Sequence, residues 1–300
     1  MTDELRNIRM LRYRVESNEK SNKSTCDLSN KGYIKLPDDI FHNYSCLKEM
    51  SLADNKLVKL PKNLFAGCYN LQSINFVNCE LKNLPEHIFT GCNQLRRVEL
   101  RHNKLRTLPK KLFAGCSYLH TFDLHGNNLI RLPNDLFQDC PLLKNAVFSF
   151  NHLTSLPDNL FENCATLTHV NFCNNTLKSI PDNLFANCNK LQTVLLYENN
   201  LSQLSENLLI QCANINRFEL DYYLVYLTLP YTHNINTIVD TDMDEFEENT
   251  KYILRQSDYY MKPWVEYSKV ILKFRRNPID AFSTGWSVRK YAIIHPSLLE

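Results

Sequence analysis

Apolar residues recur along the chain in a fixed 24-residue pattern. In one copy the apolar positions are Leu47, Met50, Leu52, Leu57, Leu60, Leu64, Phe65 and Cys68. The same pattern begins again, without an insertion, at Leu71, Leu95, Leu119, Leu143, Leu167 and Leu191. A constant period of this length indicates a solenoid, in which each unit covers the apolar face of the next.

Each unit begins with a segment typical of a short strand. The spacing of Leu47, Met50 and Leu52 places alternate side chains on one buried face. Asn55 follows, and its side-chain amide can satisfy backbone groups where the chain turns. An equivalent residue recurs at Asn103, Asn127, Asn151, Asn175 and Asn199, while Cys79 and Lys31 take this position in two other units. The stacked units are therefore expected to form a ladder of Asn side chains beside the strands.

The second half of each unit reads Leu-Pro-x-x-Leu-Phe-x-x-Cys. Pro61 fixes φ and lacks an N–H, so it suits the start of a short helical turn. Leu64, Phe65 and Cys68 then point back toward the strand. Because a single unit cannot bury this face alone, each row is expected to become a continuous spine. The Phe row consists of Phe41, Phe65, Phe89, Phe113, Phe137, Phe161 and Phe185.

The complete pattern, LxxLxLxxNxLxxLPxxLFxxC, resembles the leucine-rich repeat family in its 24-residue form. The F-x-x-C feature, with Cys where many members have Leu, resembles the BspA-like subgroup. The resemblance covers residues 23–220 and implies an α/β repeat solenoid. This solenoid is a horseshoe with a concave parallel β-sheet and short convex helical turns. It also implies that partners bind on the concave face.

Three regions are expected. Residues 1–22 are polar with scattered apolar positions, which fits either a capping helix or a disordered tail. Residues 23–220 form the leucine-rich repeat domain, with about eight repeats. Residues 221–300 leave the repeat pattern and are expected to be a C-terminal capping or interaction segment, with helices near 243–257 and from Pro263 onward.

Charge and cysteine content limit the expected partners and the expected cellular compartment. The net charge is +2, so no general attraction to nucleic acid or anionic membrane is expected. The N-terminus has no apolar h-region, and no apolar run is long enough for a transmembrane helix. Seven of the eleven cysteines recur at the repeat period and read as small buried hydrophobes. Reduced thiols predict an intracellular, cytoplasmic location, in a host cell if the chain comes from a pathogen or virus.

The variable positions of the strands are the candidate binding residues on the concave face. One column, expected to be exposed, reads Ala53, Val77, Arg101, His125, Ser149, Cys173, Tyr197 and Asp221. Charge is concentrated between Arg97 and His125, and aromatic and Arg side chains are favoured in binding hot spots. The candidate partner-binding residues are Arg97, Glu99, Arg101, His102, Asp123, His125, Phe150 and Tyr197.

The same residues give little support for catalysis. His102, His125 and Asp123 could approach one another on adjacent strands, but they mix charges on an open sheet, so no metal site is expected. Residues 240–251 resemble the start of a calcium loop, yet Glu245 replaces the required Gly and Lys251 the required Glu. The basic side chains between Lys262 and Arg276 read as a solvated face. We expect no cofactor and no catalytic residue.

The sequence thus predicts a non-enzymatic scaffold that binds a protein or an extended peptide through its concave face, with no nucleic acid or membrane. One alternative is an adaptor or effector, of the kind found in intracellular pathogens or viruses, that recruits a second protein through its C-terminal segment. Another is an enzyme that uses residues 221–300. Deleting these residues would distinguish the three functions.

Overall fold

The computed structural model describes residues 3–42, 44–202, 204–205, 208–209 and 211–220. The expectations for residues 221–300 lie outside this part of the chain. These are the capping segment, its two helices, and the adaptor and catalytic alternatives.

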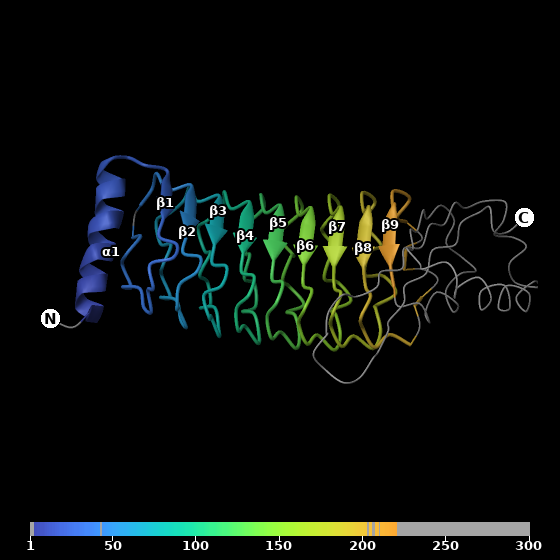
Figure 1. The fold of residues 1–300 in the computed structure, drawn as a ribbon. Helices are drawn as coiled ribbons and strands as arrows, with labels where there is room; N and C mark the ends of the chain where they lie inside the picture. The colour runs from blue at the N-terminus through green and yellow to red at the C-terminus, as the bar shows by residue number, and fades with distance from the viewer. Residues whose placement is uncertain (1–2, 43, 203, 206–207, 210, 221–300) are drawn as a thin grey trace, which may run out of the picture.

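Nine short parallel strands form one sheet and follow one another in chain order (Figure 1). They are β1 (Thr25–Asp27), β2 (Glu49–Ser51), β3 (Ser73–Asn75), β4 (Arg97–Glu99), β5 (Thr121–Asp123), β6 (Asn145–Val147), β7 (His169–Asn171), β8 (Thr193–Leu195) and β9 (Arg217–Glu219). Each strand pairs with the next at equivalent repeat positions, so that Met50 lies opposite Ile74 and Ile74 opposite Val98. The predicted leucine-rich repeat solenoid is confirmed, and equivalent side chains stack in rows.

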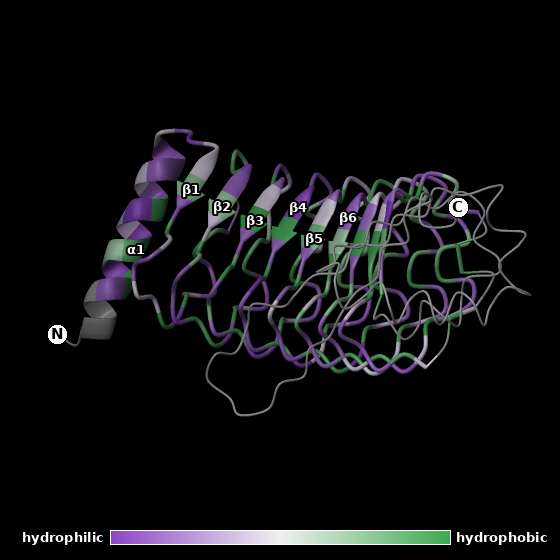
Figure 2. Ribbon diagram, turned by 45° about the vertical axis from the view of Figure 1, so that its right-hand side comes forward, coloured by the Kyte–Doolittle hydropathy of each residue, from purple (hydrophilic) through white to green (hydrophobic). Residues whose placement is uncertain are grey.

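The N-terminal helix α1 (Asp3–Lys20) lies beside β1 at one end of the solenoid (Figure 1). Leu11 and Val15 are buried in the same core as the repeats, while Tyr13 is exposed. The helix is mostly hydrophilic, with only a few hydrophobic positions (Figure 2). Arg12 on the helix forms an ion pair with Asp39 at 2.7 Å. The helix therefore shields the apolar side of the first repeat with a narrow apolar stripe.

The side of the solenoid opposite the sheet is made of short turns packed on stacked Phe side chains. In these turns backbone N–H groups bond carbonyls three residues earlier, as Cys68 does to Phe65 at 3.0 Å. Rings of the predicted Phe row stack on their neighbours, with centroids 5.7 Å apart for Phe89 and Phe113. The row of seven cysteines beside them is buried, and burial raises the pKa of the Cys92 thiol to about 12. These thiols thus behave as core hydrophobes.

The Asn ladder satisfies backbone groups in two successive repeats. Asn127 Nδ2 donates to the carbonyls of Leu100 and Leu124, at 2.9 and 3.0 Å. Asn127 Oδ1 accepts from the backbone N–H of Leu105 at 3.1 Å. Cys79, at the same position in another repeat, donates its thiol to the Leu52 carbonyl at 3.0 Å. The ladder therefore ties each turn to the strand of the preceding repeat.

The residue immediately before each ladder position adopts a left-handed backbone conformation. This left-handed row comprises Asn30, Asp54, Asn78, His102, Gly126, Phe150, Asn174 and Glu198, with φ between 52° and 66°. Gly, Asn and Asp tolerate this region, whereas a bulky side chain is uncommon there. Phe150, at φ 55°, and Glu198, at φ 54°, are thus the outliers of the row, and of the two only Phe150 is exposed. The row forms the border of the sheet face.

The expectation that one whole column of strand positions is exposed is wrong at three of its residues. Ala53, Ser149 and Cys173 are 7%, 2% and 2% exposed. The chain turns directly after these residues, and at two of them a larger neighbour covers the short side chain: the His125 ring lies against Ser149, and Tyr197 hydrogen-bonds to Cys173. Asp221, the last residue of the column, lies outside the described residues.

Candidate binding site on the sheet face

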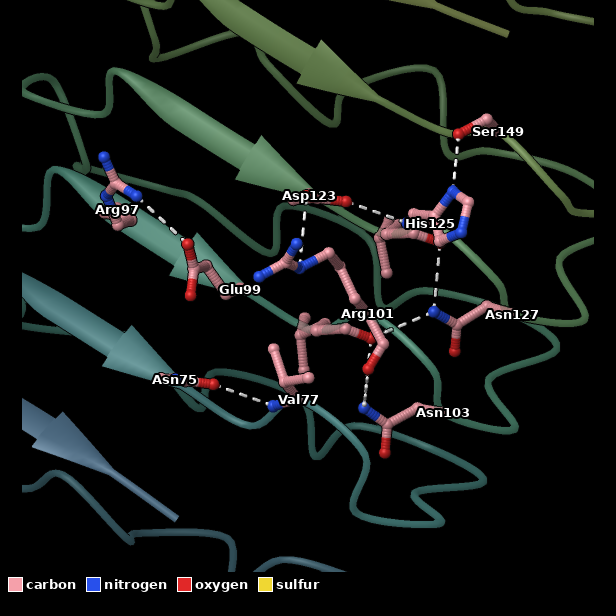
Figure 3. Close-up of polar contacts among 12 residues, drawn as sticks. Asn75, Val77, Arg97, Glu99, Arg101, Asn103, Asp123, His125, Asn127 and Ser149 are labelled. Carbon is pink, nitrogen blue, oxygen red and sulfur yellow. Dashed lines mark hydrogen bonds and ion pairs between the residues drawn. The ribbon is translucent and has the colours of Figure 1, made fainter. Parts of the chain in front are cut away.

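Charged side chains pair along and between two neighbouring strands in the middle of the sheet. On β4, Arg97 donates to Glu99 at 3.0 Å, and Glu99 lies opposite Asp123 of β5. Arg101, just beyond β4, points toward Asp123, with its Nε 3.5 Å from Asp123 Oδ2 (Figure 3). The register of β4 and β5 thus places two carboxylates side by side, and each of them is paired with an arginine.

The hydrogen-bond donors of Arg101 are only partly paired with neighbouring residues. Its Nε is buried and has no hydrogen-bond partner, although it lies 3.5 Å from Asp123 Oδ2. The side chain as a whole remains 43% exposed. A guanidinium presents five N–H donors, and unpaired buried donors are costly. Because the Nε is buried, it is the exposed part of the Arg101 guanidinium that can donate to a carboxylate or carbonyl brought by a partner.

His125 connects the charged centre to the border of the sheet face. Its Nδ1 is hydrogen-bonded to Ser149 Oγ at 2.8 Å, as Figure 3 shows. Its ring meets the His102 ring edge-on, with centroids 5.0 Å apart, and lies 4.9 Å from the Phe150 ring. We call His102, His125 and Phe150 the His–Phe cluster. Three consecutive repeats contribute to it.

Burial shapes the ionisation of this region. Burial raises the pKa of the Asp123 carboxyl, and the backbone N–H of His125 and the charge of Arg101 oppose this shift. The pKa of His125 is lowered, first by burial and then by the positive charge of His102. A neutral imidazole at position 125 can pack against Phe150 without the desolvation cost of a charge.

Two residues that complete the cluster were not singled out from the sequence. Gly126 leaves the space for His102, because a Cβ at Gly126 would stand 2.7 Å from His102 Nδ1. Ser149 holds the ring of His125. The sequence signal for Gly126 is that it is a Gly in a row that otherwise contains Asp, Asn, His, Phe and Glu. No sequence signal pointed to the role of Ser149.

Tyr197, the last candidate residue, does not join the others. It occupies the position equivalent to His125 three repeats further along, or about 14 Å away at the usual strand spacing. The structure therefore brings together His102, Asp123, His125, Arg101 and Phe150, places the Arg97–Glu99 pair beside them, and leaves Tyr197 apart.

The arrangement is suited to contact with another molecule across an open surface. In the part of the chain that the structure describes, no group of three or more His, Cys, Asp or Glu side chains is placed to hold a metal ion. No helix among the same residues is long and apolar enough to cross a membrane. What the surface does offer is an exposed aromatic ring, an underused guanidinium and paired charges.

Comparison with protein families gives one match. The model of the BspA type leucine rich repeat region matches residues 19–144 and 130–240, in six copies. None of the curated proteins searched matches the chain.

Several solved structures share the fold. Toll from Drosophila, in complex with Spatzle, is 23% identical and aligns with a TM-score of 0.61 over 77% of this chain and 30% of its own. The Leptospira interrogans protein LIC12759 is 24% identical, with a TM-score of 0.56 over 74% and 64%. YopM, a leucine-rich effector protein from Yersinia pestis, is 23% identical, with a TM-score of 0.53 over 77% and 60%. The chain thus spans less than two-thirds of each of these structures.

Proposed function

Because the chain belongs to the BspA-type leucine-rich repeat family, we propose that it is a non-enzymatic scaffold that binds a protein partner through the sheet face. The fold is typical of protein–protein interaction modules, and Toll, which shares it, forms a complex with Spatzle. The sheet presents its surface already ordered, which limits the entropy lost on binding.

One observation carries this proposal: Phe150 is both exposed and held at φ 55°. At the equivalent position three other repeats have Asn30, Asn78 and Asn174, a residue that tolerates this backbone. Phe is disfavoured there, and its ring is still 45% exposed to water. Strain of this kind, at an exposed site, points to a function for the side chain rather than to stability.

The neighbours of Phe150 indicate what the partner presents. The His–Phe cluster offers aromatic rings inclined to one another by 86° and 59°, and the exposed part of the Arg101 guanidinium offers donors to an acceptor close by. Exposed aromatic and Arg side chains at the centre of a patch are the usual anchors of protein interfaces. A partner segment with an apolar side chain next to a carboxylate or carbonyl group would satisfy both features.

We also propose that the protein works in a reducing compartment inside a cell. Ten of its eleven cysteines are buried, and the thiols of the repeat row have raised pKa values because of burial. A core of this kind depends on thiols that stay reduced.

Photo-crosslinking at position 150 tests the proposed surface. Phe150 is replaced by the photoreactive amino acid benzoylphenylalanine, which keeps an aromatic ring there. In a matched control Tyr69, an aromatic side chain that is 63% exposed in the turn after β2, is replaced in the same way. Both proteins are irradiated in a lysate of the source cells, and crosslinked proteins are identified by mass spectrometry.

We expect a discrete crosslinked protein from position 150 that is absent from position 69. Addition of excess unmodified protein should compete with this crosslink. Crosslinking at position 69 alone, or the same products from both positions, would contradict a binding site on the sheet face.

A further inference from the structure

A second surface, on the side of the solenoid that follows the Asn ladder, carries a concentrated positive charge. It is built from residues 56–60, 80–84, 104–108 and 128–132, which are equivalent segments of four consecutive repeats. Backbone hydrogen bonds join these segments, as from Lys104 to Leu81 at 2.8 Å and from Asn128 to Leu105 at 2.9 Å. Their exposed basic side chains, which we call the basic flank, are Lys56, Lys59, Lys82, Lys104, Arg106 and Arg131.

The positive charge of the basic flank is not balanced locally. Within the four described segments Glu80 is the single acidic residue, and it pairs with Lys104 at 2.8 Å. Of the other five basic side chains, none forms an ion pair with a described residue. In the equivalent segments of the next two repeats, 152–156 and 176–180, the basic residues are Lys178 and, if protonated, His152. The equivalent segment of the preceding repeat, residues 32–36, adds Lys35. Since the whole chain has a net charge of only +2, this positive charge is concentrated in the segments before residue 133.

The basic flank stabilises the charged form of the Glu80 carboxylate. Its pKa is lowered by the hydrogen bond from Lys104, and further by the charges of Lys104, Lys56 and Lys82. Three lysines from three repeats therefore surround one carboxylate. The positions equivalent to Glu80 in the next repeats are Lys104 and Asn128, so Arg106 and Arg131 have no such carboxylate beside them.

We propose that the basic flank binds an acidic polypeptide segment of a partner protein, whose carboxylates extend the pattern that Glu80 begins. The segments contain no aromatic residue on which nucleic-acid bases could stack, and Ile130 is their one exposed large hydrophobic side chain, too little for a membrane. The basic flank is separate from the sheet face. Its failure to bind would leave the proposed function untouched, and the reverse also holds.

Binding of defined anions to the full chain tests this assignment. The probe is a fluorescent peptide of about ten residues that alternates Glu and Ser, so that an extended chain places every carboxylate on one face. A peptide with Gln in place of Glu is its neutral control. Fluorescence anisotropy is measured at about 50 mM and about 200 mM salt, because screening must weaken a charge-driven contact.

Two protein variants locate the site. The double variant Lys82→Glu, Arg106→Glu reverses two charges within the basic flank and should weaken binding of the acidic peptide at least about tenfold. The control Lys178→Glu reverses a single charge at the equivalent position of a later repeat and should alter binding by less than about twofold. Thermal unfolding curves of both variants establish that the solenoid is intact.

Three results would overturn the proposal. One is equal binding of the Glu and Gln peptides, or no binding of either at the lower salt. Another is an equal loss in Lys178→Glu and in the double variant, which would reduce the effect to net charge. The last is tighter binding of a uridine oligonucleotide or of phosphatidylserine vesicles than of the acidic peptide, lost in the double variant, which would assign the flank to nucleic acid or to a membrane.

Discussion

The imidazole of His102 lies over Gly126, so close that a Cβ on residue 126 would stand 2.7 Å from His102 Nδ1. Gly126 also has φ 66°, a conformation that costs an L-residue roughly 1–2 kcal/mol. Gly126→Ala should therefore lower the free energy of unfolding by about 2 kcal/mol, through both backbone strain and displacement of the His102 ring. Urea denaturation followed by circular dichroism measures this loss.

Gly32→Ala is the matched control for that substitution. Gly32 has φ 68°, but nothing lies within 4 Å of its would-be Cβ. It should lose only the backbone term, about 1 kcal/mol. The extra loss at Gly126 should shrink when His102→Ala is added. Equal losses at the two glycines would show that the His102 contact contributes nothing.

Phe150→Asn should separate stability from binding. Asn relieves the left-handed strain, as Asn78 and Asn174 do in equivalent positions, and removes an exposed apolar ring. We expect the free energy of unfolding to rise by about 0.5 kcal/mol, while the crosslinked partner is bound at least about tenfold more weakly. Denaturation and affinity capture report the two effects. A destabilised variant that still binds normally would make Phe150 a packing residue.

Replacement of Asn127 tests the ladder. Asn127→Ala leaves two carbonyls and the N–H of Leu105 without their side-chain partner, which should cost about 2–4 kcal/mol of unfolding free energy. Asn127→Cys should cost less, because the thiol of Cys79 already bonds the equivalent carbonyl in its own repeat. Urea midpoints should thus rank wild type above Cys and Cys above Ala. A reversed order of the two variants would contradict the ladder's role.

His125 predicts a pH dependence with a definite sign. Its pKa is lowered in the folded chain, so the unfolded chain binds more protons as the pH falls below about 6.5. The contribution of neutral His125 is therefore complete above that pH and is lost below it. His125→Asn should flatten the fall in the urea midpoint of the wild type between pH 7 and pH 5. Unchanged pH dependence in His125→Asn would refute this.

The thiols should react in two classes. Cys46 is the one cysteine that is partly exposed, whereas the others are buried, with pKa values of about 12 for Cys68, Cys116 and Cys164. A thiol reagent such as DTNB should react quickly with one group in the native protein, and Cys46→Ser should abolish that phase. Denaturation without reductant should release eleven reactive thiols. A smaller number would reveal disulfides and contradict the proposed reducing compartment.

The architecture could be predicted from the 24-residue repeat alone. The positions equivalent to Leu47, Phe65 and Cys68 recur at a constant spacing, as do the Asn positions of the ladder. Only one arrangement buries every apolar row, which is to stack the units in register. For that reason the parallel sheet, the Phe row and the Asn ladder could all be predicted. Exposure at the ends of the strands could not, because it depends on neighbouring repeats: Ser149 is covered by His125 and Cys173 by Tyr197.

Only part of the candidate binding site could be predicted from the sequence. Charged residues between Arg97 and His125 stood out by composition, because they occupy variable positions of a known pattern. Contacts between repeats decided the rest: Gly126 makes room for His102, His125 joins Ser149 and Phe150, and Arg101 keeps an unpaired Nε. A one-dimensional repeat fixes which positions become neighbours. The sizes, charges and backbone angles of those neighbours, which act together only in three dimensions, determine the surface that they form.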